Sequence, residues 1–191
     1  LVDLPGIVRT VTAGQDASVI QSVNEMIDRY LAQERTIVLA IVPANQDVAT
    51  VDILERALRV DPTGERTIGV LTKPDLVGDG AEDEVVAVLK NERKPLRLGY
   101  VMVKNRSAAE LKQGRGLGTA VRDLERRYFA DHKVWRTLPK EYLGIDMLTQ
   151  RLTGLLTKRI QKVLPELKWE LQELFAQAEA GSNRLGLPPP E

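Results

Sequence analysis

One tetrapeptide in this sequence carries the residue types that can recognise a guanine base. It consists of Thr72, Lys73, Pro74 and Asp75. A carboxylate in the plane of guanine accepts hydrogen bonds from both the ring N–H and the exocyclic amine, and adenine offers no such pair of donors. The stem of Lys73 can lie along the purine face, and Thr72 can tie the loop to its neighbours. Taken alone, the tetrapeptide fits a strand-ending turn equally well.

A second motif suits the phosphate end of a nucleotide. It consists of Asp3, Leu4, Pro5 and Gly6. The aspartate can hold Mg²⁺, usually through water, and the Gly6 N–H can approach a γ-phosphate because no Cβ intervenes. For this tetrapeptide by itself, a plain Asp-Pro-Gly turn is the better interpretation.

A third segment, formed by Asn105, Arg106 and Ser107, offers hydrogen-bond donors near a base. The guanidinium of Arg106 can stack over the base or the ribose. By itself this tripeptide carries almost no signal, so its meaning depends on where the fold places it.

Three apolar runs rich in β-branched residues predict the strands that position these motifs. They cover residues 36–42, 67–71 and 99–103. Unbroken rather than alternating hydrophobicity is typical of parallel strands that are buried on both faces. Only Leu1 and Val2 could belong to a strand at the start of the sequence.

Apolar residues three or four apart predict helices between and around the strands. The expected helices lie at residues 19–32, 48–58, 85–89 and 117–129. Strands that alternate with helices predict an α/β fold with a doubly wound parallel sheet and right-handed crossovers. Ligands of such sheets bind beyond the carboxyl ends of the strands. We therefore expect four loops to converge there, with Asp3 and Asp75 facing a shared hollow.

The last part of the sequence predicts a long helical stretch. An apolar stripe runs from Leu148 to Ala178. Pro165 lies inside it, and a proline removes a helix hydrogen bond and clashes with the preceding turn. We therefore expect two helices, or a marked kink, at Leu164 and Pro165, with the second helix ending at Gly181 and Ser182.

Composition narrows the possible function classes. The 191 residues include 27 Lys and Arg and 27 Asp and Glu, for a formal net charge of +0. This balance argues against non-specific binding of nucleic acid. The apolar runs are too short to span a bilayer. The absence of cysteine excludes disulfides and thiolate sites, and the single histidine, His132, leaves no zinc cluster.

An Asp-x-x-Gly followed by a Thr-Lys-x-Asp, each expected at the end of a strand, is what a guanine-nucleotide domain of the phosphate-loop class requires. Together with residues 1–7, 42–47, 60–76 and 99–100, these motifs resemble the dynamin superfamily of large GTPases. The stretch 61–76 is similar to Mx-type members, whereas residues 105–107 are closer to the membrane-cutting dynamins. The resemblance covers nearly the whole sequence and leaves the subfamily open.

The resemblance implies a role for each motif residue. Asp3 is implied to lie on the magnesium side of a bound GTP and Gly6 to donate its N–H to the γ-phosphate, with residues 7–15 forming a mobile switch. Thr72, Lys73 and Asp75 are implied to select guanine, and residues 105–107 to close the base pocket.

The resemblance also implies self-assembly. GTPase domains of this superfamily pair across their nucleotides, which makes Asp47 a contact to the partner's base. An N-cap for the helix that begins near Val48 is an equally natural role for Asp47.

Pro165 matches a hinge, so residues 1–164 would form part of a GTPase domain and residues 165–191 the start of a bundle helix. The implied protein is a cytoplasmic homo-oligomer, with membrane or microtubule association left to parts outside this sequence.

One family motif is missing. No G-x-x-x-x-G-K-[ST] phosphate loop occurs in the sequence, although that loop supplies the lysine and N–H groups for the phosphates. Because the first residue is Leu1, we expect the loop to precede it in a longer protein. We also expect residues 1–191 alone neither to hydrolyse GTP nor to fold stably, and we assign no catalytic residue to them. The alternatives are a catalytically incomplete assembly or interaction module and, more remotely, an unrelated phosphate-loop ATPase.

Overall fold

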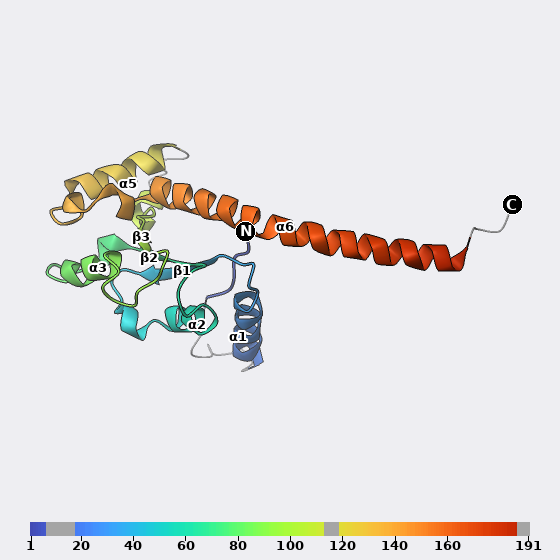
Figure 1. Cartoon of the computed structure of the whole chain (residues 1–191). Coiled ribbons are helices and arrows are strands. Elements are labelled where there is room, and N and C mark those ends of the chain that lie inside the picture. Colours follow the sequence, from blue (N-terminus) through green and yellow to red (C-terminus); the bar gives the residue numbers. More distant parts are fainter. Residues whose placement is uncertain (7–17, 113–118, 187–191) are drawn as a thin grey trace. The chain divides into compact units, whose positions relative to one another are not determined.

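The structure is a computed structural model that describes residues 1–6, 18–112 and 119–186. Contacts divide the chain into two units, Leu1–Gln150 and Arg151–Glu191, which are described separately. Figure 1 shows the elements in chain order.

The first unit is built on a three-stranded parallel sheet. Its strands are β1 (Val38–Pro43), β2 (Thr67–Thr72) and β3 (Tyr100–Met102), in the order β1-β2-β3. Every residue of the central strand β2 is buried, as its unbroken apolar run predicts. The three predicted strands and the α/β fold are confirmed. The strand expected to end at Leu1 and Val2 is not formed, because residues 1–6 have no regular secondary structure.

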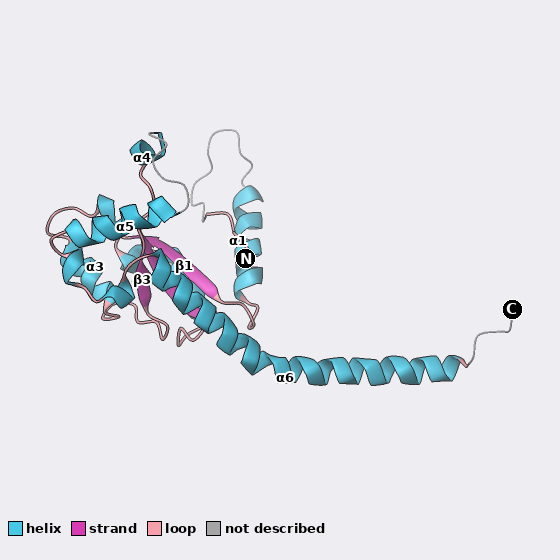
Figure 2. Cartoon of the chain, turned by 90° about the horizontal axis from the view of Figure 1, so that it is seen from above, coloured by secondary structure: helices cyan, strands magenta, loops and turns pink. Residues whose placement is uncertain are grey.

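Most helices of the first unit lie close to the predicted positions, whereas the short helix at residues 108–112 was not predicted; Figure 2 shows them around the sheet. In the first unit they are α1 (Ser18–Leu31), α2 (Asp52–Val60), α3 (Glu82–Leu89), α4 (Ala108–Lys112) and α5 (Thr119–Asp131). Short 3₁₀ turns are η1 (Val48–Thr50), η2 (Pro74–Leu76), η3 (Trp135–Thr137) and η4 (Lys140–Tyr142). The helix expected at residues 48–58 is divided, because Val51 is extended, with φ −86° and ψ 109°, and separates η1 from α2.

The apolar side chains of the sheet and helices form two clusters. The larger joins Leu54 of α2, Leu89 of α3, Met102 of β3, Phe129 of α5 and Trp135 of η3. The smaller joins α1, the amino end of β1 and α2, through Ile27, Leu31, Val38 and Ala57. The sheet is therefore fixed to helices that come from sequence positions both before and after it.

A buried carboxylate orders the turn that leads into β2. One oxygen of Asp61 accepts a hydrogen bond from Glu65 N (3.0 Å), and the other accepts from Arg66 N (3.0 Å) and Thr67 Oγ1 (2.6 Å). The guanidinium of Arg66 donates to Leu31 O (2.6 Å), at the carboxyl end of α1. The Asp-Pro-Thr-Gly-Glu-Arg-Thr stretch that carries part of the family resemblance thus fixes β2 against α1.

The long helix α6 runs from Ile145 to Leu185 without interruption, although Pro165 lies inside it. Of the two alternatives expected at Pro165, two separate helices are therefore wrong, whereas a marked kink stays a prediction. The helix also passes through Gly181 and Ser182, where we expected it to end. This is possible because a glycine within a helix costs only about 1 kcal/mol. It stops where Gly186 adopts a left-handed φ of +77°, as glycine commonly does after a helix.

None of the described helices is both long and apolar enough to cross a membrane.

The close packing of Gly69 against Tyr100 yields a test of the sheet. A Cβ at Gly69 would lie 2.1 Å from Cδ1 of Tyr100, whose ring is buried and whose Oη donates to Lys94 O. We expect Gly69→Ala to lower the local stability of β2 by about 1–3 kcal/mol, since an overpacked core must shift. Amide hydrogen exchange of β2 in the intact protein measures this local free energy.

Gly154→Ala is the matched control, because nothing lies within 4 Å of a Cβ at Gly154. Alanine favours a helix over glycine, so this change should stabilise slightly. Equal protection of β2 in wild type and Gly69→Ala would contradict the packing described for this strand.

Candidate functional site

Three of the loops singled out in the sequence leave the sheet at the same edge. Ala44 N, after β1, donates to Thr72 O at the end of β2 (2.6 Å). Val103 N, after β3, donates to Leu71 O (2.8 Å). The carboxyl ends of neighbouring parallel strands meet at one edge, so the loops at residues 44–47, 73–75 and 104–107 converge as predicted.

The loop after β2 alternates between buried and exposed residues. Thr72 and Pro74 are buried, whereas Lys73 and Asp75 are exposed. The Thr72 hydroxyl donates to Val42 O (3.4 Å), which ties the loop to β1 as the sequence suggested. The loop thus exposes the ammonium of Lys73 and the carboxylate of Asp75 to solvent, while its buried residues hold its backbone in place.

Lys73 adopts a left-handed conformation, with φ 56° and ψ 46°. This conformation costs a non-glycine residue about 1–2 kcal/mol, and the right-handed helical region is disfavoured before a proline. The 3₁₀ turn that follows holds it in place, because Leu76 N donates to Lys73 O (3.0 Å). Backbone strain of this kind is concentrated at functional sites.

Asp75 and Lys104 have a common neighbour in Tyr128 of α5. Burial raises the pKa of the Tyr128 hydroxyl, and the negative charge of Asp75 raises it further. The ammonium of Lys104 lies 5.5 Å from the centre of the Tyr128 ring. The carboxylate predicted to hold guanine and the start of the loop predicted to close the base pocket therefore lie in one neighbourhood.

The loop after β3 is held by the carboxylate of Glu110, which was not predicted from the sequence. Ser107 N donates to Glu110 Oε2 (2.7 Å), and Glu110 N donates to Ser107 Oγ (3.2 Å). This reciprocal pair is a capping box at the start of α4, and the spacing Ser-x-x-Glu is its signature. Lys104 Nζ also lies 2.9 Å from Glu110 Oε2. The hydrogen bond from Ser107 N and the ammonium of Lys104 lower the pKa of Glu110 from 4.5 to about 2.

Asp47 caps the turn η1. Its Oδ1 accepts a hydrogen bond from Ala49 N (2.9 Å), and its side chain is exposed. The capping role proposed from the sequence is confirmed, whereas the contact to a partner's base stays a prediction.

A hollow of about 200 Å³ lies between residues 44–48, residues 76–78 and α3. Asp47 lines it, but Asp3 and Asp75 do not. Ligand pockets usually measure about 300–1,000 Å³. This hollow is smaller than that, and it is not the shared hollow expected for Asp3 and Asp75.

The motif from Asp3 to Gly6 does not join the other loops in this structure. Leu4 packs against the cluster that contains Val38, at the amino end of β1, whereas Asp75 follows the carboxyl end of β2. The expected convergence of four loops is therefore wrong for this motif. The physical reason is that residues 1–6 form no strand, so no backbone ladder holds them at the carboxyl edge. Residues 7–15, the predicted switch, lie outside the described residues.

The described residues do not assemble a magnesium site. Asp3 is exposed, and no three or more His, Cys, Asp or Glu side chains in the described ranges are placed to hold a metal ion. Asp3 therefore stays a predicted ligand only. Pro165 lies within α6 and is exposed, and its role as a hinge likewise stays a prediction.

Comparison with known proteins supplies the family. Residues 1–74 match the dynamin family, and residues 84–191 match the dynamin central region. Interferon-induced GTP-binding protein MxE of Danio rerio is 40% identical over 187 residues, which are 97% of this chain and 30% of that protein. Interferon-induced GTP-binding protein Mx of Siniperca chuatsi is 39% identical over 191 residues, 100% of this chain and 30% of that protein.

A third relative, interferon-induced GTP-binding protein Mx of Dicentrarchus labrax, is 37% identical over 100% of this chain and 29% of its own length. The chain thus spans about 30% of the length of the curated relatives it matches. Two matches that cover residues 1–74 and 84–191 agree with the resemblance found in the motifs. The chain belongs to the dynamin family.

Proposed function

We propose that this chain supplies the guanine-recognition half of a dynamin-like GTPase. The observation that supports this most directly is the loop after β2, which is pinned by buried Thr72 and Pro74 and exposes Lys73 and Asp75. Relatives named as GTP-binding proteins match the chain over nearly its whole length, which supports the same ligand.

Each loop has a defined part in this proposal. The carboxylate of Asp75 accepts hydrogen bonds from the guanine ring N–H and amine, and the stem of Lys73 covers the purine face. Asn105, Arg106 and Ser107 close the pocket on the other side. Both loops are anchored to the sheet, so the base site is preorganised before the nucleotide arrives.

The phosphate end is assigned to Asp3, Leu4, Pro5 and Gly6, with Mg²⁺ bound together with GTP. This part of the proposal rests on the family resemblance, because the described residues do not bring Asp3 to the base loops. Hydrolysis to GDP and phosphate is assigned to the intact protein, since this sequence contains no phosphate loop and the reaction needs one.

Self-assembly is part of the proposed function. Asp47 is exposed at the carboxyl edge and is proposed to reach the base bound by a second copy. On the second unit, Leu171, Leu174 and Phe175 have exposed fractions of 64%, 61% and 70%. An exposed apolar stripe of this size usually marks an interaction surface, and we propose that it packs in a helical bundle. Cytoplasmic location and attachment to membranes or microtubules are proposed for the intact protein.

A catalytically incomplete assembly module is the second candidate. It is favoured by the position of Leu4, which places the Asp3 motif at the opposite end of β1 from the base loops. Steady-state GTP turnover by the intact protein separates the two candidates, because an assembly module binds partners without hydrolysing GTP.

Asp75→Asn tests the base assignment. The asparagine side chain has a single oxygen to face the two guanine donors and places an N–H₂ group opposite the other, so the variant should bind GTP about 30- to 150-fold more weakly, as expected for loss of a charge-assisted pair worth about 2–3 kcal/mol. The asparagine amide complements the extra carbonyl of xanthine, so XTP should bind better than GTP. Competition among GTP, XTP and ATP for the intact protein measures both effects.

Asp79→Asn is the matched control for this experiment. Asp79 is an exposed carboxylate a few residues further along the chain, paired with Lys133 (3.3 Å), and its replacement should leave nucleotide preference unchanged. An unaltered preference for guanine in Asp75→Asn would show that another residue reads the base.

Glu110→Gln tests how the loop after β3 is held. Because the folded pKa of Glu110 is about 2 and its ordinary value is 4.5, this carboxylate stabilises the fold fully above about pH 4.5 and loses its effect as the pH falls toward 2. Near neutral pH the variant should be less stable by about 1 kcal/mol. Thermal unfolding of both proteins between pH 7 and pH 3 measures the difference, which should shrink below pH 4.5; a constant difference would contradict this account.

A further inference from the structure

A buried carboxylate on α5 connects two segments that are far apart in the sequence. Glu125 is 5% exposed. Its Oε1 accepts a hydrogen bond from Lys104 N (2.8 Å), and its Oε2 accepts one from Ile145 N (2.9 Å). One side chain thus contacts both the segment that leads into the loop at residues 105–107 and the first residue of α6.

Both N–H groups need a partner. Ile145 begins α6, and the first N–H groups of a helix have no partner within the helix. A negative charge at that position also interacts favourably with the helix dipole. Lys104 lies beyond the end of β3, where the ladder with β2 has stopped. The carboxylate therefore satisfies two backbone donors through part-buried hydrogen bonds, and leaving either donor without a partner would destabilise this junction.

A backbone hydrogen bond also joins the end of β3 to the start of α6, independently of the Glu125 side chain. Gly144 N donates to Met102 O (2.8 Å), so the residue before α6 is bonded to the last residue of β3. Gly144 has φ +92°, and a Cβ there would lie 3.5 Å from Glu125 Oε2. The end of β3, the loop that follows it and the start of α6 form one junction.

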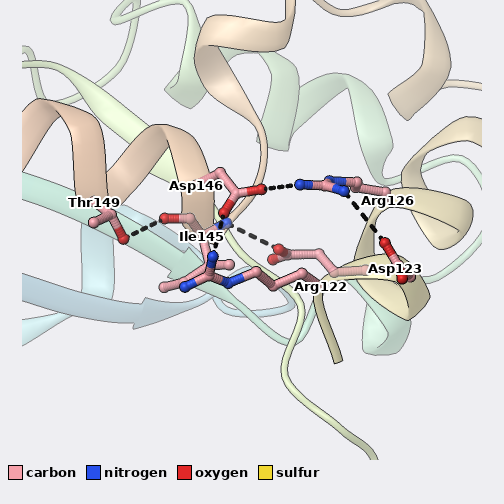
Figure 3. Close-up of polar contacts among 7 residues, drawn as sticks. Arg122, Asp123, Arg126, Ile145, Asp146 and Thr149 are labelled. Atoms are coloured by element: carbon pink, nitrogen blue, oxygen red, sulfur yellow. Dashed lines mark hydrogen bonds and ion pairs between the residues drawn. The ribbon is translucent and has the colours of Figure 1, made fainter. Parts of the chain in front are cut away.

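Exposed ion pairs also join α5 to α6 at this junction (Figure 3). Asp146 Oδ2 lies 2.6 Å from Arg126 Nη2, and Asp146 Oδ1 lies 3.4 Å from Arg122 Nη1. These pairs hold α5 and the start of α6 together directly. Exposed ion pairs contribute little to stability, which makes Asp146 a useful comparison with Glu125.

We propose that Glu125 is a positioning residue of the guanine-nucleotide site, which holds the loop at residues 105–107 in register with the first turn of α6. The inference rests on the proposed function, in which the loop at residues 105–107 closes the guanine pocket. When a nucleotide orders the loop, the same carboxylate restrains Ile145. Nucleotide binding at the carboxyl edge thereby restricts the motion of the first residues of α6.

Glu125→Gln in the intact protein is the direct test. The glutamine amide keeps one acceptor oxygen and turns an N–H₂ group toward one of the two backbone donors. We expect GDP and GTP to bind about tenfold more weakly, with kcat at saturating GTP changed by less than about twofold. A residue with a merely structural role would lower the amount of active protein without separating affinity from kcat in this way.

Asp146→Asn is the matched control, since the ion pairs of Asp146 with Arg122 and Arg126 join the same two helices. Its nucleotide affinity should stay within about twofold of the wild type. Equal affinity of Glu125→Gln and wild type, or an equal loss in Asp146→Asn, would overturn the role of Glu125. Failure of the wild type itself to bind GDP would instead overturn the proposed function, so the two failures are distinguishable.

Amide hydrogen exchange of the wild type provides a measurement that needs no variant. The proposal predicts that the amides of Lys104 and Ile145 gain protection together when GDP is added. Protection gained at Lys104 with none at Ile145 would overturn the coupling, even if Glu125→Gln fails to fold.

Discussion

The parallel pairing of β2 with β1 on one side and β3 on the other determines where chemistry can occur in this chain. All six residues of β2 are buried, so the strand has no exposed face on which to carry function. Function must lie in the loops beyond its end, and the register with β1 and β3 fixes which loops those are. Parallel pairing brings three carboxyl ends to one edge, and there the loops with Asp47, Asp75 and Asn105 meet.

At the carboxyl edge of the sheet, the loops after β2 and β3 have fixed backbones and exposed polar side chains. The loop after β2 buries Thr72 and Pro74 and holds Lys73 in a left-handed conformation, so that Asp75 is presented on a backbone with little freedom. The loop after β3 is fixed by Glu110 from one side and by Glu125 from the other. Loops held in this way lose little conformational entropy when a ligand binds, which favours affinity.

Features that depend on local sequence were predicted well. The unbroken apolar runs gave the three strands to within a few residues, because burial on both faces leaves a local composition signal. The Ser107-x-x-Glu110 capping box is also a local sequence pattern, although it was not among the predicted features. Glu125 carried no such signal, because its partners at positions 104 and 145 are brought to it only by the fold.

The position expected for the Asp3 motif, and one of the two alternatives expected at Pro165, failed for reasons that single motifs cannot reveal. Pro165 does not divide α6, since helical residues on both sides continue the backbone hydrogen bonds and outweigh one local penalty. The Asp3 motif packs through Leu4 at the amino end of β1, because a loop reaches the carboxyl edge only when a strand carries it there. The motif predicts a chemistry, but its position depends on a strand that the described residues do not form.

The central claim is that the exposed carboxylate of Asp75 reads the Watson–Crick edge of guanine at the carboxyl edge of β2. A crystal structure of the intact protein with bound GDP tests it most directly. The account predicts both oxygens of Asp75 at hydrogen-bond distance, about 2.7–3.2 Å, from the ring nitrogen and exocyclic amine of guanine, with residues 105–107 on the opposite side of the base. A base bound elsewhere, with the Asp75 carboxylate facing solvent, would contradict it.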